Sequence, residues 1–83
     1  MSQTAIKILL VDDEDDYRRS CGKFMERMGH TVRLAASGAE AMSFLNRESF
    51  DVAVFDIDMP GMSGLELMQR VHEESHDVEV VFL

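Results

Sequence analysis

The spacing of the hydrophobic positions changes in a regular order along the chain. Residues 6–11 and 52–55 are short, almost unbroken apolar runs, which are typical of strands covered on both faces. Residues 31–35 alternate between polar and apolar, placing Val32 and Leu34 on one face, and residues 78–83 form a further apolar run. The pattern therefore predicts four short strands.

Between these strands, the apolar residues recur at the spacing of a helix. Ser37 and Ser63 are each followed three residues later by a glutamate, which is the capping-box signature of a helix start. Gly29 follows the first periodic stretch, where a glycine commonly ends a helix. The expected buried stripes of the three helices are Tyr17, Cys21, Phe24, Met25 and Met28; then Ala41, Phe44 and Leu45; then Leu65, Met68, Val71 and His72.

Strictly alternating strands and helices of these lengths predict right-handed βαβ crossovers and a parallel sheet. We expect an α/β fold of the flavodoxin-like, doubly wound type with strand order 2-1-3-4, formed as one domain by residues 1–83. The sequence stops inside an apolar run, so we expect a fold that is incomplete at its carboxyl end. An uncovered strand at that edge favours self-association or domain swapping.

Charge and cysteine content restrict the classes of partner. With 16 Asp and Glu against 8 Lys and Arg, the net charge is −8, which argues against nucleic acid and anionic membranes as partners. Cys21 is the single cysteine, so no disulfide can form within the chain. The sequence shows no signal peptide and no apolar run near the ~20 residues of a membrane span. We therefore expect a cytoplasmic protein.

Acidic residues gather where two strands are expected to end. Asp12 and Asp13 follow the first strand, and Asp56 and Asp58 follow the third. These strands are neighbours in the flavodoxin-like order, and ligands bind beyond their carboxyl ends. Two carboxylates ~4 Å apart repel by ~4 kcal/mol at an effective dielectric constant near 20, and a divalent cation reverses that cost.

The oxygen-only set of side chains favours Mg²⁺, and a carboxylate beside such an ion can attack phosphorus. Each aspartate taken alone also fits a simpler role, because an aspartate at a strand-to-helix junction is often a helix N-cap.

The residues around these acids resemble the receiver domain of two-component response regulators. The similarity rests on LLVDDE, on VFDIDMPGMSG and on the alternation between them, from residue 6 to residue 83. It implies that Asp56 accepts a phosphoryl group from a sensor histidine kinase or a phosphotransfer protein. It further implies that Mg²⁺ is bound by Asp13, by Asp56 and by the backbone carbonyl of Asp58, with Asp12 orienting a metal-bound water. Such a module is a phosphoacceptor and not an enzyme that turns over substrate.

The same resemblance implies that two further residues of the family lie beyond Leu83. These are a Ser or Thr after the fourth strand and a Lys after the fifth. For residues 1–83 alone we therefore expect weak or absent phosphorylation and no switching.

Other functions remain as alternatives. Asp56 and Asp58 also resemble the nucleophile and general acid of haloacid-dehalogenase-type phosphatases, although that motif usually ends the first strand of its sheet. His72, Glu73 and His76 spell H-E-x-x-H, a zinc-site pattern when it lies on one helix, but a solvated helix end explains this polar segment better. A purely structural, self-associating module without phosphotransfer is the third alternative.

Overall fold

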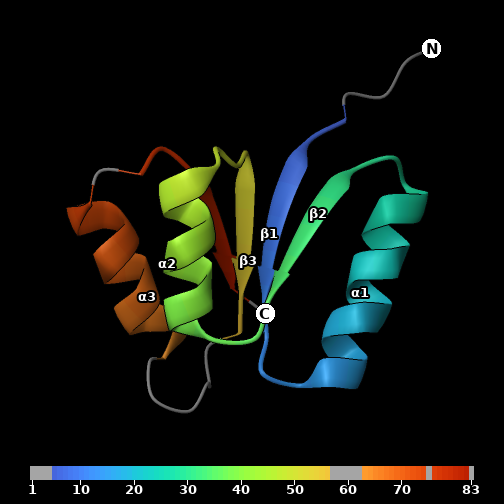
Figure 1. Cartoon of the computed structure of the whole chain (residues 1–83), viewed down its shortest axis with the longest axis horizontal. Helices are drawn as coiled ribbons and strands as arrows, with labels where there is room; N and C mark the ends of the chain where they lie inside the picture. Colours follow the sequence, from blue (N-terminus) through green and yellow to red (C-terminus); the bar gives the residue numbers. More distant parts are fainter. Residues whose placement is uncertain (1–4, 57–62, 75, 83) are drawn as a thin grey trace.

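Strands and helices alternate along the whole chain (Figure 1). The computed structural model describes residues 5–56, 63–74 and 76–82. The strands are β1 (Lys7–Val11), β2 (Thr31–Ala35), β3 (Val52–Phe55) and β4 (Glu79–Phe82). The helices are α1 (Asp15–Arg27), α2 (Gly38–Arg47) and α3 (Gly64–Glu73). The strands form one parallel sheet in the order β2-β1-β3-β4, which confirms the predicted fold class and strand order.

Helices cover both faces of this sheet. Figure 1 shows α1 on one side of the strands, with α2 and α3 together on the other side. Leu9 and Val11 pack in the core beneath α2 and α3, whereas Ile8 and Leu10 pack in the core beneath α1. This double coverage explains why β1 is apolar at successive positions, as the sequence predicted.

The register of the sheet brings two strand ends to the same level. Val11 lies opposite both Ala35 of β2 and Phe55 of β3. The amide of Asp12 donates to the Ala35 carbonyl at 3.1 Å, and the amide of Asp56 donates to the Val11 carbonyl at 2.9 Å. Asp12 and Asp56 therefore leave the sheet side by side.

The predicted helix starts are confirmed. Ser37 and Ser63 are the N-caps of α2 and α3, and each hydroxyl accepts a hydrogen bond from the amide three residues later, at 3.2 Å. After α1, Gly29 has a φ of 95°, a left-handed conformation that favours glycine.

The predicted buried face of α1 is largely wrong. Tyr17, Phe24 and Met28 are exposed, Phe24 by 63%, and Cys21 is only half-buried. The buried residue of α1 is Gly22, where an added Cβ would lie 2.9 Å from Leu34 Cδ2. The helix approaches β2 at its glycine, a contact that a search for apolar side chains does not detect.

The predicted face of α3 is rotated from the observed one. Val71 is buried as predicted, together with Leu67, whereas Met68 and His72 are exposed and Leu65 is 54% exposed. Apolar residues form two stripes on this helix, and the stripe that packs on the sheet begins at the small residue Gly64. On α2, Ala41 and Leu45 are buried as expected, together with Met42, while Phe44 is only partly buried.

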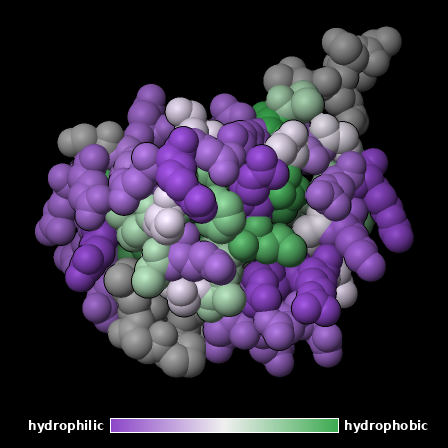
Figure 2. Space-filling view, viewed as in Figure 1, coloured by the Kyte–Doolittle hydropathy of each residue, from purple (hydrophilic) through white to green (hydrophobic). Residues whose placement is uncertain are grey.

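Hydrophilic residues cover the helices on the face of the molecule that Figure 2 shows, and hydrophobic residues reach the surface between the helical layers. No helix in the described part of the chain is long and apolar enough to cross a membrane.

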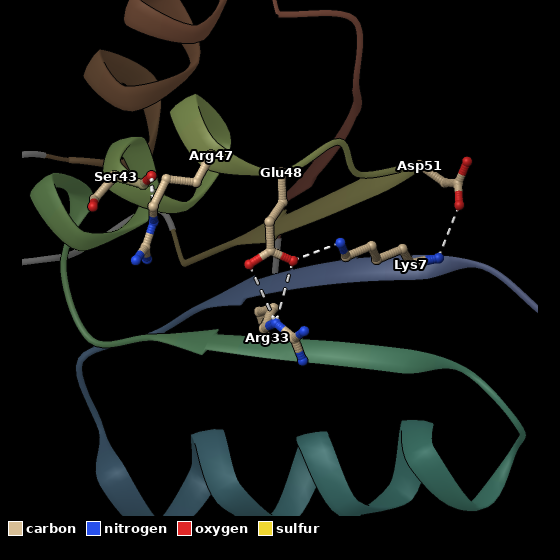
Figure 3. Close-up of polar contacts among 6 residues, drawn as sticks. All are labelled: Lys7, Arg33, Ser43, Arg47, Glu48 and Asp51. Atoms are coloured by element: carbon tan, nitrogen blue, oxygen red, sulfur yellow. Dashed lines mark hydrogen bonds and ion pairs between the residues drawn. The ribbon is translucent and has the colours of Figure 1, made fainter.

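A polar network fastens the end of α2 to the sheet (Figure 3). Glu48, the C-cap of α2, lies 2.5 Å from Lys7 Nζ on β1 and 3.3 Å from Arg33 Nε on β2. The amide of Lys7 also donates to Asp51 Oδ2 at 2.8 Å. The hydrogen bond from Lys7 is the main cause that lowers the pKa of Glu48 below its usual value, with Arg33 contributing in the same direction. One carboxylate therefore joins α2 to two neighbouring strands.

Candidate metal centre

Three carboxylates meet at the carboxyl ends of β1 and β3. Asp12, Asp13 and Asp56 each offer an oxygen, and these oxygens all lie within 4.8 Å of one another. Asp12 is buried, with 4% of its surface exposed, while Asp56 is half-buried and Asp13 is exposed. The site therefore runs from a buried acid to one that faces solvent, as a site open to an incoming group requires.

The backbone after β1 holds Asp12 through local hydrogen bonds. Its Oδ1 accepts a hydrogen bond from the amide of Glu14 at 2.9 Å. The N-cap of α1 is Glu14, whose side chain makes no capping bond. Because neither Asp12 nor Asp13 occupies the N-cap position, the N-cap alternative for these two residues is wrong. Asp15 and Asp16 occupy the first turn of α1 and are exposed, where the helix dipole favours acids.

Arg18 makes contacts with this loop that the sequence analysis did not identify. Its Nη1 donates to the main-chain oxygen of Asp12 at 2.8 Å, and its Nη2 lies 2.5 Å from Asp15 Oδ1. The spacing of three residues from Asp15 to Arg18 indicates the ion pair. No sequence pattern indicates the bond back to Asp12.

Tyr17 lies within the electrostatic field of the cluster. A hydrogen bond with Cys21 is the largest cause that raises the pKa of Tyr17 above its usual value of 10.0. The charges of Asp12 and Asp56 raise it further. Because Tyr17 is the single tyrosine of the chain and there is no tryptophan, it is a natural spectroscopic reporter for this site.

The predicted backbone ligand at Asp58 lies outside the described residues. The sequence thus identified three acids that the structure brings together, and the fourth site residue stays a prediction.

The donor set fits a hard divalent cation. All three side chains offer oxygen, and such cations prefer carboxylate oxygens together with water. Mg²⁺ in particular needs only one or two carboxylates and keeps open positions for phosphate oxygens. The arrangement suits binding of a metal ion beside a nucleophilic carboxylate.

Comparison with known proteins decides the family. The family model of the response regulator receiver domain matches residues 8–83. The chain belongs to the response regulator receiver family. The similarity to receiver domains noted in the sequence is therefore confirmed, and receivers are the phosphoacceptor modules of two-component systems.

Relatives of this receiver support the assignment. The response regulator receiver protein CpdR of Brucella abortus is 38% identical over 77 residues, which cover 93% of this chain and 64% of that protein. Response regulator TrrA of Thermotoga maritima, solved in complex with Mg²⁺ and BeF, has a TM-score of 0.86 and 30% identity, covering 93% of this chain and 67% of that one.

The N-terminal domain of a receiver protein from Methanoculleus marisnigri has a TM-score of 0.90 and 30% identity, covering 95% of this chain and 66% of that one. This chain thus spans less than two thirds of the length of CpdR.

The family and the fold remove support from two alternatives. Asp56 directly follows the third strand of the sheet in this receiver, whereas the phosphatase motif usually ends the first. The H-E-x-x-H pattern does not lie on one helix, because α3 ends at Glu73 and His76 lies in the following loop. His76 Nε2 instead lies 3.1 Å from Asn46 Oδ1 of α2.

Proposed function

We propose that Asp56 is the phosphoacceptor of this receiver and that Asp12 and Asp13 complete a Mg²⁺ site around it. The observation that carries the proposal is the convergence of three carboxylate oxygens within 4.8 Å at the ends of two adjacent strands. The three carboxylates repel one another unless a cation lies among them. The cluster therefore lowers the stability of the fold when it is empty and is useful as a binding site for a cation. Membership of the family supports the same assignment.

The proposed reaction is transfer of a phosphoryl group from a phosphohistidine. A carboxylate oxygen of Asp56 forms a bond to phosphorus while the phosphorus–nitrogen bond of the donor breaks. The electron pair of that bond stays with the imidazole nitrogen. The product is an aspartyl phosphate, so each receiver molecule accepts one group and performs no turnover of generic phosphate esters.

The residues divide the work of this reaction. Asp13 and Asp56, with the main-chain carbonyl of Asp58, would hold Mg²⁺, and Asp12 would orient a water of its coordination shell. Bound Mg²⁺ neutralises charge on the carboxylates and on the phosphoryl oxygens. Asp56 supplies the nucleophile from a half-buried position next to the exposed Asp13.

The proposal extends to partners and compartment. A sensor histidine kinase or a phosphotransfer protein is the proposed donor, as befits a two-component receiver. The single cysteine and the absence of a disulfide within the chain support a reducing compartment, which we propose to be the cytoplasm.

Self-association of the chain is a further proposal. It is supported by β4, a strand at the edge of the described sheet whose Val81 is 49% exposed.

The test is incubation of the chain with acetyl phosphate and Mg²⁺, followed by mass spectrometry of the intact protein and of its peptides. We expect a weak, Mg²⁺-dependent gain of about 80 Da, the mass of one phosphoryl group, located on Asp56. Asp56→Asn should abolish the adduct. Asp16→Asn, which removes an exposed acid outside the cluster, should retain it.

Two results would contradict the proposal. One is an adduct that persists in Asp56→Asn. The other is an adduct that forms to the same extent without Mg²⁺. A steady release of product from a generic aryl phosphate would instead favour the phosphatase alternative.

A further inference from the structure

Arg18 is a charged side chain folded back against the loop that carries the metal-site acids. Its side chain is only 11% exposed, whereas the neighbouring Arg19 on the same helix is exposed. The guanidinium donates to the main-chain oxygen of Asp12 at 2.8 Å and to Asp15 Oδ1 at 2.5 Å. A planar group with two donors in fixed directions is well suited to joining a carbonyl and a carboxylate in this way.

The carbonyl that Arg18 contacts belongs to the peptide joining Asp12 to Asp13. Pairing with the sheet ends just before it, because the bond from the Asp12 amide to the Ala35 carbonyl is the last one there. Beyond that point, the amide of Glu14 bonds to Asp12 Oδ1. Rotation of the Asp12–Asp13 peptide would displace the Asp13 side chain, and the bond from Arg18 opposes this rotation.

We propose that Arg18 is a positioning residue of the metal centre, which fixes the Asp12–Asp13 peptide so that the Asp13 carboxylate stays within reach of Asp56. This inference rests on the proposed function of the site. The geometry and the charge of Arg18 act in opposite directions, because a nearby cation repels a divalent ion while a fixed loop presents its ligands. Removal of Arg18 should therefore weaken Mg²⁺ binding if Arg18 positions the loop, and strengthen it if only the charge of Arg18 matters.

The test compares Mg²⁺ binding by the chain and by Arg18→Met, Arg18→Lys and Arg19→Met, measured by calorimetry at fixed ionic strength. We expect Arg18→Met to weaken Mg²⁺ binding about tenfold, as is typical for the loss of a residue that orients a metal ligand. Arg18→Lys keeps the positive charge but replaces the planar guanidinium by a single ammonium group. Its affinity for Mg²⁺ should therefore lie between those of the parent and Arg18→Met. Arg19→Met removes the same charge from the same turn and should bind like the parent.

A second measurement tests the loop without metal. Hydrogen exchange of the Glu14 amide should lose its protection in Arg18→Met and keep it in Arg19→Met. Folded Arg18→Met that binds Mg²⁺ as tightly as the parent or more tightly, or that leaves Glu14 protected, would overturn the inference. If Arg18→Met does not fold, parent-like affinity in Arg18→Lys overturns it. Absence of Mg²⁺ binding by the parent would contradict the proposed function, with the Glu14 result still deciding whether Arg18 orders the loop.

Discussion

Single charged residues join different elements of this receiver. Arg18 joins the first turn of α1 to the end of β1, and Glu48 joins the end of α2 to Lys7 and Arg33 on two strands. Substitutions at these positions should therefore have effects beyond one element.

Glu48 gives the fold a specific dependence on pH. Its pKa lies below the usual value of 4.5, chiefly because Lys7 donates a hydrogen bond to the ionised carboxylate. A carboxylate with a lowered folded-state pKa contributes stability above the unfolded-state pKa, and this contribution is lost as the pH falls through the folded-state value. We expect Glu48→Gln to lower the melting temperature at pH 7, with the difference from the parent shrinking below pH 4.5. A difference that stays constant down to acidic pH would contradict this role.

At the scale of elements, the strands follow closely from the sequence and the helix faces do not. Residues 52–55 were predicted with the observed bounds because a strand buried on both faces must be apolar throughout. The face of α1 was missed because its closest contact with the sheet is Gly22, which has no side chain to enter a hydrophobic pattern. The face of α3 was predicted only in part, with Val71 correct, because two apolar stripes compete there and only packing on the sheet selects between them.

The residues of the candidate site also divide into those that the sequence predicts and those that it does not. Asp12, Asp13 and Asp56 were predictable because parallel strands end at one edge of their sheet, so strand ends identify neighbours. The bond from Arg18 to the Asp12 carbonyl depends on a side-chain conformation that residue spacing does not specify.

The start of α3 offers a test at the scale of one element. Ser63 accepts a hydrogen bond from the amide of Glu66, which would otherwise lack a partner within the helix. We expect Ser63→Ala to lower the free energy of unfolding by about 1 kcal/mol, measured by urea denaturation. Ser43→Ala, a change at an exposed interior position of α2, should have a smaller effect or none. Equal losses for the two variants would contradict the capping role.

At the scale of the whole molecule, coverage of the edge strand β4 differs between its two faces. Val80 and Phe82 pack against the core beneath α2 and α3, whereas Val81 faces the other way and is 49% exposed. We expect concentration-dependent association of the chain in sedimentation experiments, reduced by Val81→Lys. Leu65→Lys introduces a lysine at an exposed apolar position of α3 and should leave the association unaltered. A compact monomer at all concentrations would contradict this expectation.

Mg²⁺ binding tests most directly whether the carboxylates converge to hold a cation. The measurement is a titration of the chain with MgCl₂, followed by the fluorescence of Tyr17 and by calorimetry, in the parent and in Asp13→Asn, Asp56→Asn and Asp16→Asn. We predict saturable binding that Asp13→Asn and Asp56→Asn each weaken about tenfold or more, while Asp16→Asn binds like the parent. Equal affinities in all four proteins, or no saturable binding in the parent, would contradict the assignment of this cluster as the metal centre of the receiver.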